Sequence, residues 1–246
     1  MAFPHKLTFP ALPPALRKAA FFAVIAFLIF LLFPRYFFQP VREGLDPSYD
    51  LAVHLAWKYH LIFGKDIVSG FGPLAILNSR FPVAVNQWVY LLLDIYFLIT
   101  LFHILTVIFK KSFGVITVVY LVIAFYLEID DSPFQRLFLF FLFYLFSLVK
   151  EPRRWIYLIQ ALLLSLLSFY YKVDLGMTAL LLFFVGISYV LVLKKINIKG
   201  YTLILFALCS GILLSAWLLH VRLPGYIAGN LHLIAAYGDA MFLPAD

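Results

Sequence analysis

The sequence predicts an all-α polytopic membrane protein with about seven transmembrane helices and a long outer first loop. Hydrophobic residues make up 65% of the 246 residues, well above the roughly 45–50% of a soluble domain. Charged residues are only 13% and fall in short breaks between apolar runs. About 20 apolar residues are needed for a helix to cross the hydrocarbon core. The predicted spans are 19–35, 84–109, 113–129, 134–149, 155–171, 176–193 and 202–220.

Composition also excludes other classes of protein. The net charge is +7, but the basic residues are scattered between apolar runs, as flanking charges of membrane helices are, and form no stripe for nucleic acid. The single cysteine, Cys209, leaves no disulfide framework and no cysteine-based metal site. We therefore expect the lipid bilayer, and no nucleic acid, as the surroundings of this chain.

The first span and the breaks predict an orientation. Lys6, Arg17 and Lys18 precede the run that begins at residue 19, and no small-residue cleavage site follows it, so we expect a retained signal anchor. The later breaks alternate between basic and acidic, as in a chain that threads back and forth. This pattern predicts that the N-terminus lies in the cytoplasm, that the C-terminus lies outside, and that most carboxylates are on the outer face. Residues 221–246 would belong to an outer segment, and the chain would be a fragment of a longer protein.

The outer loop, 36–83, is predicted to contain an amphipathic helix over 47–63. Asp46 precedes Pro47 as an N-cap residue precedes a first helical proline, and Gly64 would end the helix. Leu51, Leu55 and Ile62 then share one face, while Asp50, His54 and Lys58 recur every four residues on the other. Such a helix lies in the membrane interface with its apolar side down.

A second acidic cluster precedes the span at 134–149. Ser132, Pro133 and Gln135 form a capping box with proline at the first helical position, and Asp130 and Asp131 stand just before it. Arg136 lies in the first turn, where a helix N-terminus beside an arginine is a plausible seat for a phosphate. The alternative is a capped helix with a snorkelling arginine.

Other polar residues leave alternatives open. Asp50 and His54 lie one turn apart, so they are candidates for a metal site or for a hydrogen-bonded interfacial histidine. Asp94, inside the second span, should face the bundle and pair, either for function or through a hydrogen bond to a tyrosine or serine. The conventional catalytic motifs HExxH, CxxC and GxSxG are absent from the sequence. No internal repeat indicates a transporter built from two halves.

The loop sequence resembles a group of bacterial membrane proteins. GLDPSY, FGKD and FGPL follow one another between residues 44 and 74. A first helix, this long outer loop and then a second acidic outer loop resemble the bacterial polytopic glycosyltransferases of the GT-C class. More narrowly, the run itself is similar to a group of large glycosyltransferase-like bacterial membrane proteins. The resemblance implies a module of seven helices with amphipathic helices in the first outer loop. It also implies a sugar donor linked to polyprenyl phosphate.

The resemblance assigns roles residue by residue. Asp46 occupies the place of the catalytic carboxylate, and Asp130 and Asp131 match a second acidic loop that holds the acceptor or a divalent cation. No DxD motif stands in the first loop. Among the outer cations we favour Arg136 and Lys172 for the donor phosphate, with Asp50, His54 and Asp94 as accessory residues. The alternatives are a transporter or flippase for a lipid-linked substrate and a non-catalytic assembly subunit of the cell envelope.

Overall fold

The computed structural model describes residues 13, 15, 16, 19, 22, 23, 45–81, 83, 85–111, 133–151 and 155–241. These residues form helices joined by turns, with isolated β-bridges at Phe63, Phe71 and their partners. The all-α prediction is therefore confirmed for the described part of the chain. The helices are α2 (Leu45–Lys58), the short 3₁₀ helix η1 (Pro73–Ala75), α3 (Ile76–Ser79), α4 (Gln87–Lys111), α6 (Pro133–Lys150), α7 (Trp155–Tyr171), α8 (Val173–Val192), α9 (Ile198–Leu218) and α10 (Leu223–Met241).

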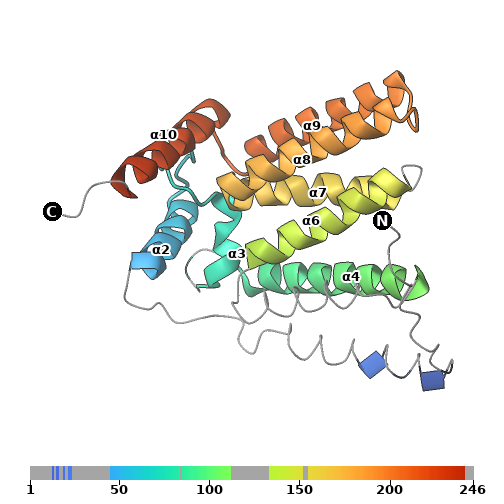
Figure 1. Ribbon diagram of the computed structural model, residues 1–246. Coiled ribbons are helices and arrows are strands. Elements are labelled where there is room, and N and C mark those ends of the chain that lie inside the picture. Colours follow the sequence, from blue (N-terminus) through green and yellow to red (C-terminus); the bar gives the residue numbers. More distant parts are fainter. Residues whose placement is uncertain are drawn as a thin grey trace.

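Five of these helices lie side by side in a bundle, and α2, α3 and α10 gather at one end of it (Figure 1). The most extensive packing joins α6, α7 and α8, while α4 packs on α6 and α9 packs on α7 and α8. Large aromatic side chains fill the centre, with Phe141, Tyr144, Tyr157 and Phe183 fully buried. We call the end where α4, α6 and α8 begin the loop end, because residues 45–81 cover it.

The bundle helices agree with the predicted spans. Trp155–Tyr171 matches its predicted range residue for residue, and α6 begins at Pro133, one residue before the predicted start. Helix α8 starts three residues early because a single extended residue, Lys172, separates it from α7. The predicted span 113–129 lies outside the described residues, and so does the predicted span 19–35 except for residues 19, 22 and 23. Residues 223–241, predicted only as an outer segment, form the helix α10.

Three of the described helices are long and apolar enough to cross a membrane: Gln87–Val107, Val173–Val192 and Ile198–Leu218. Helix α7 is as apolar but has 17 residues. Their outward faces carry large hydrophobic side chains, including Phe206 on α9 at 69% exposed and Leu181 on α8 at 62%. Contiguous apolar surface of this kind favours contact with lipid over contact with water.

Helix α2 differs from its prediction at both ends. It begins at Leu45, two residues early, and it ends at Lys58, well before Gly64. A residue in the left-handed conformation, His60 (φ 55°), closes it, and Leu61 donates a backbone hydrogen bond to the carbonyl of Ala56 (2.9 Å). This is the Schellman arrangement. It is achieved here without glycine, which is why the sequence signal at Gly64 misplaced the helix end.

Candidate functional site

The segment from Phe63 to Phe81 ties the loop end together through backbone hydrogen bonds to distant helix ends. Gly72 donates to the carbonyl of Tyr171 (2.8 Å), and Val173 donates to that of Gly70 (3.2 Å). Phe63 donates to the carbonyl of His220 (3.2 Å) and accepts from Arg222 (2.8 Å). Each backbone group removed from water needs such a partner. The loop is therefore an ordered cover that joins α7 to α8 and α9 to α10.

Glycine is required where the cover crosses the end of α7. A Cβ on Gly72 would lie 2.2 Å from the carbonyl oxygen of Tyr170 and 2.3 Å from the hydroxyl of Tyr226. Both distances are far below van der Waals contact. The close approach also lets the Tyr226 hydroxyl donate to the carbonyl of Phe169 (3.1 Å), which attaches α10 to α7. Burial raises the pKa of Tyr226, so this hydroxyl remains a donor.

A buried ion pair fixes the cover to α4. Two guanidinium nitrogens of Arg80 donate to the two carboxylate oxygens of Asp94, at 2.5 and 3.0 Å. The side chains are 11% and 5% exposed. Arg80 adopts the left-handed conformation (φ 48°) just after α3, and its guanidinium lies 5.7 Å from the centre of the Tyr90 ring. A bidentate pair of this kind is strong and directional.

This pair settles what Asp94 contacts. The sequence predicted that Asp94 would face the bundle and pair, and it does, but its partner is Arg80 and not a tyrosine or serine hydroxyl. Arg80 belongs to the loop that precedes the helix of Asp94. The sequence contained one signal for this pair: Arg80 is a cation with no assigned role, and it stands shortly before a span whose single carboxylate is Asp94.

His54 lies inside the fold and not on a polar face. It is fully buried, with Nε2 3.0 Å from the Ser79 hydroxyl and its ring 5.1 Å from that of Phe81. Nδ1 has no hydrogen-bond partner in the described part of the structure. Burial lowers the pKa of His54 from 6.5 to about 4. The predicted amphipathic pattern misplaced His54 because α3 covers that face of α2.

The cations proposed for a phosphate lie at the same end of the bundle. Lys172 is the extended residue between α7 and α8; its amino group is 3.5 Å from the Asp174 carboxylate and 5.9 Å from the Phe71 ring centre. Arg136 stands in the first turn of α6 and is partly buried. Both helices, α6 and α8, begin at the loop end (Figure 1).

The predicted catalytic carboxylates are described in part. Asp46 is the second residue of α2, and the position of its side chain lies outside the described part of the structure. Asp130 and Asp131 lie outside the described residues altogether. Asp50 is partly buried on α2, one turn before His54. Within the described residues, no three histidine, cysteine or carboxylate side chains gather into a metal site.

These features describe a helical protein with three membrane-length helices among its described residues and an ordered cover at one end of its bundle. No family model matches the chain, and neither the curated proteins nor the solved structures contain a match to it.

Proposed function

We propose that the chain is an integral protein of a bacterial inner membrane that transfers a sugar from a polyprenyl-phosphate donor to an acceptor at the outer face. The main support is the ordered cover. The loop between the first two predicted spans folds onto the bundle end where Lys172 and Arg136 also stand. A lipid-linked donor keeps its tail in the bilayer. A transferase for it therefore needs its active site at the ends of membrane helices and not in a soluble domain.

The proposed chemistry uses one carboxylate and two cations. The bond between the anomeric carbon and the phosphate oxygen breaks as the acceptor oxygen bonds to that carbon through an oxocarbenium-like state. The Asp46 carboxylate takes the proton of the acceptor hydroxyl as general base. Arg136 and Lys172 hold the leaving polyprenyl phosphate. Asp130 and Asp131 hold the acceptor or a divalent cation.

The buried residues of the cover have a supporting role in this proposal. Asp94 is bound on both carboxylate oxygens by Arg80, and His54 is fully buried against Ser79 and Phe81. Neither side chain is presented to a substrate in this arrangement. We therefore assign them to holding α2, which carries Asp46 and Asp50, against α3 and α4.

The test is turnover of radiolabelled polyprenyl-phosphate sugars by the purified protein in nanodiscs. Asp46→Asn should lower transfer by about 10²–10⁴-fold, the range of general-base catalysis. Asp66→Asn is the matched control in the same loop, because the Asp66 carboxylate accepts the backbone N–H of Ile62 (3.0 Å) and pairs with Lys65. Asp66→Asn should retain transfer.

Three results would overturn the proposal. Wild-type rates in Asp46→Asn would remove the assigned base. Movement of the labelled lipid across the bilayer without its consumption would indicate a flippase instead. If the lipid is neither moved nor consumed, the remaining alternative is an assembly subunit.

A further inference from the structure

A groove runs between α7 and α9 at the end of the bundle opposite the loop end. Its volume is about 760 Å³, within the roughly 300–1,000 Å³ of small-molecule sites. Its walls are apolar along both helices, and the lining side chains include Leu158, Ile159 and Leu162 from α7 and Leu203, Ile204 and Ala207 from α9. The groove is open to the surroundings of the bundle, because Ile159 and Leu203 are both more than half exposed. We call this space the α7–α9 groove.

The groove exists because α7 and α9 touch near the loop end and separate toward the other end. The Tyr170 hydroxyl donates to the carbonyl of Ile212 (2.5 Å). One turn farther from the loop end, a Cβ on Gly211 would lie 2.8 Å from Cδ1 of Leu166. The lining of the groove then runs from Leu162 back to the first residue of α7, about 10 Å at the roughly 1.5 Å rise of each helical residue. This length fits within one leaflet of a hydrocarbon core about 30 Å thick.

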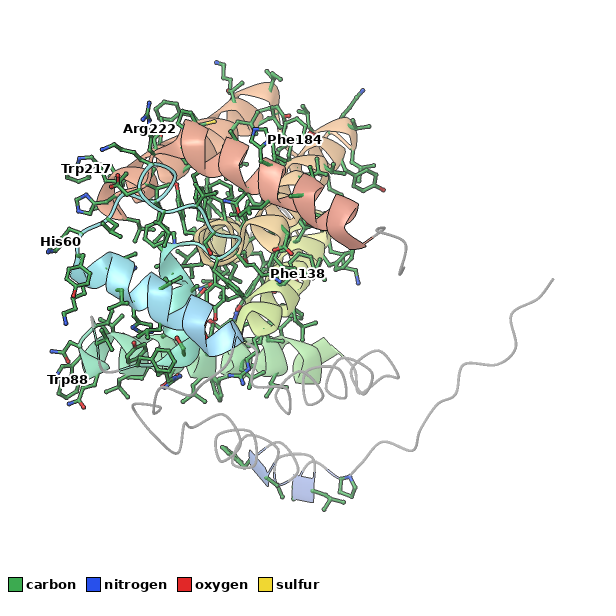
Figure 2. All side chains as sticks on the ribbon, turned by 90° about the vertical axis from the view of Figure 1, so that its left-hand side faces the viewer. His60, Trp88, Phe138, Phe184, Trp217 and Arg222 are labelled. Carbon is green, nitrogen blue, oxygen red and sulfur yellow. The ribbon has the colours of Figure 1, made fainter. Side chains whose placement is uncertain are left out.

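Exposed tryptophans mark the two ends of the bundle. Trp88 on α4 and Trp217 on α9 stand at the loop end, and in Figure 2, which views that end, both lie at the margin of the molecule. Trp155 is the first residue of α7, at the opposite end, and it lines the end of the groove that we call its mouth. Tryptophan concentrates where the membrane meets water on both sides. The mouth of the α7–α9 groove is therefore expected at the level of the lipid headgroups.

Three lysines stand at this mouth. Lys195 lines the groove, and its amino group donates to the carbonyl of Val149 (2.9 Å), which holds it beside the end of α6. Lys194 precedes it in the same turn, and Lys199 lies in the first turn of α9; both are exposed. In the described part of the structure, none of the three pairs with a carboxylate. Their positive charges are therefore available to an anion from outside the described protein.

We propose that the α7–α9 groove binds one anionic phospholipid, with an acyl chain between the two helices and its phosphate at lysines 194, 195 and 199. The apolar walls match the chain. The lysines match the headgroup, since each lysine near a membrane surface favours an anionic lipid about fivefold. A zwitterionic lipid fits the walls equally well but lacks the net charge. The inference goes beyond the proposed sugar transfer and is independent of it, since it uses none of the residues assigned to that reaction.

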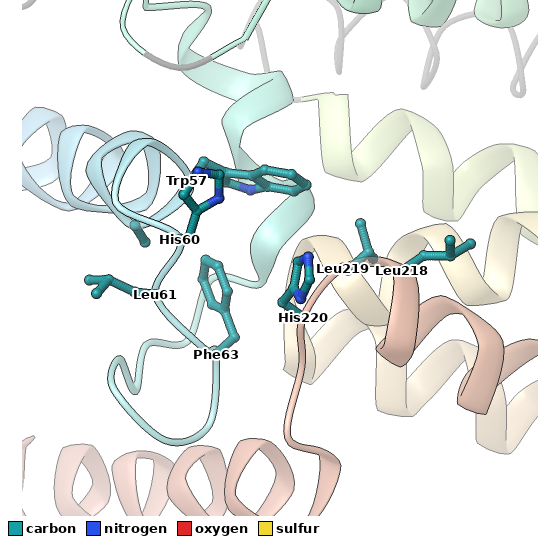
Figure 3. Close-up of a pocket in the computed structure, with 8 residues that line it drawn as sticks. Trp57, His60, Leu61, Phe63, Leu218, Leu219 and His220 are labelled. Carbon is teal, nitrogen blue, oxygen red and sulfur yellow. The ribbon is translucent and has the colours of Figure 1, made fainter.

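The pocket at the other end of α9 does not have these properties. It measures about 190 Å³, and Trp57, Phe63 and His220 are among the residues that line it (Figure 3). Among the described residues, neither a lysine nor an arginine lines this pocket. Positions at the loop end therefore serve as controls for the general attraction of anionic lipid to a protein whose net charge is +7.

The test is quenching of Trp155 fluorescence by brominated lipids in nanodiscs of phosphatidylcholine. Phosphatidylglycerol or phosphatidylcholine, brominated on the acyl chains close to the headgroup, replaces the host lipid stepwise. The difference in quenching between the wild type and Trp155→Phe isolates the signal of Trp155. Phosphatidylglycerol should reach half of its quenching at a mole fraction at least about fivefold lower than phosphatidylcholine.

Charge variants test the headgroup site. Replacing lysines 194, 195 and 199 together by glutamine should abolish the preference for phosphatidylglycerol, and replacing them by arginine should retain it. Lys58→Gln is the matched control, because Lys58 is an exposed lysine at the end of α2, on the loop side of the bundle. It should keep the preference of the wild type.

Bulk in the groove tests the acyl-chain site. Ala207→Phe should fill the groove and lower the preference for phosphatidylglycerol, whereas Cys209→Phe, at an exposed position of α9 outside the groove, should retain it. Soluble glycerol phosphate should not compete, because it has no acyl chain. Competition by glycerol phosphate, equal quenching by the two lipids in the wild type, or an unchanged preference in the glutamine variant or in Ala207→Phe would overturn the proposal. The assay contains no sugar donor, so its outcome does not depend on the proposed transfer.

Discussion

The two ends of the bundle are built differently. At the loop end, backbone hydrogen bonds join residues far apart in the chain, such as Gly72 with Tyr171 and Phe63 with His220. At the opposite end, the turn after α8 is closed by local bonds from Leu193, Lys194 and Lys195 to the preceding turn. A long-range bond there runs from the Lys195 amino group to the carbonyl of Val149 (2.9 Å).

This difference shows which end of the bundle depends on specific contacts between distant residues. A turn that only reverses the chain needs a local cap, and the left-handed Lys194 (φ 54°) supplies it. The loop end has a buried ion pair, a buried histidine and glycines in close contact with other backbone. Substitutions at the loop end should therefore cost more stability than matched substitutions at the opposite end.

The largest effect is expected at the buried ion pair. Arg80→Gln leaves the Asp94 carboxylate buried without its cation, and such a break costs about 3–5 kcal/mol. The measurement is the free energy of unfolding in an SDS titration. Lys195→Gln, which removes an exposed cation at the opposite end, should change it far less. Equal losses of unfolding free energy in the two variants would contradict the proposed difference between the two ends.

A second effect is expected at the crossing of the cover over α7. Gly72→Ala forces a methyl group against the backbone of Tyr170, and overpacking of this kind costs about 1–3 kcal/mol. Gly70→Ala is the matched control two residues away, since a Cβ there has no heavy atom within 4 Å. Thermal unfolding of both variants checks the prediction, which is wrong if the two variants unfold at the same temperature.

Acid should weaken the loop end through His54. Its pKa of about 4 in the fold lies below the ordinary 6.5, so between these values the unfolded chain binds a proton that the folded chain does not. Stability should be unaffected by His54 above pH 6.5 and should fall as the pH drops from 6.5 to 4, by at most about 1.4 kcal/mol per pH unit. His54→Gln should show a shallower slope, and an unchanged slope would assign the acid sensitivity to other groups.

The smallest effect is expected at the opposite end. The Asn197 side chain caps α9 by accepting the N–H of Gly200 (2.8 Å). Asn197→Ala should cost about 1 kcal/mol, as loss of an N-cap does. Urea or SDS unfolding would detect it. A cost above that of Arg80→Gln would reverse the proposed ranking of the two ends.

Sequence patterns predicted the bundle helices well because their signals are local. Long apolar runs, the proline at the start of α6 and the charged breaks all act within one helix. The partner of Asp94 was not predictable, because the left-handed turn at Arg80 determines where the guanidinium points. The burial of His54 depends on α3 folding back over α2.

The contacts of Gly72 and Phe63 also have a consequence for biosynthesis. The ribosome makes the cover early, but the carbonyls of Tyr171 and His220 that bind it are made much later. The cover therefore stays exposed, without these hydrogen bonds, until the hairpin of α7 and α8 and then α9 have been synthesised. Its maturation should be the last event in assembly, and a nascent chain stalled before residue 220 should remain open to protease between residues 60 and 72.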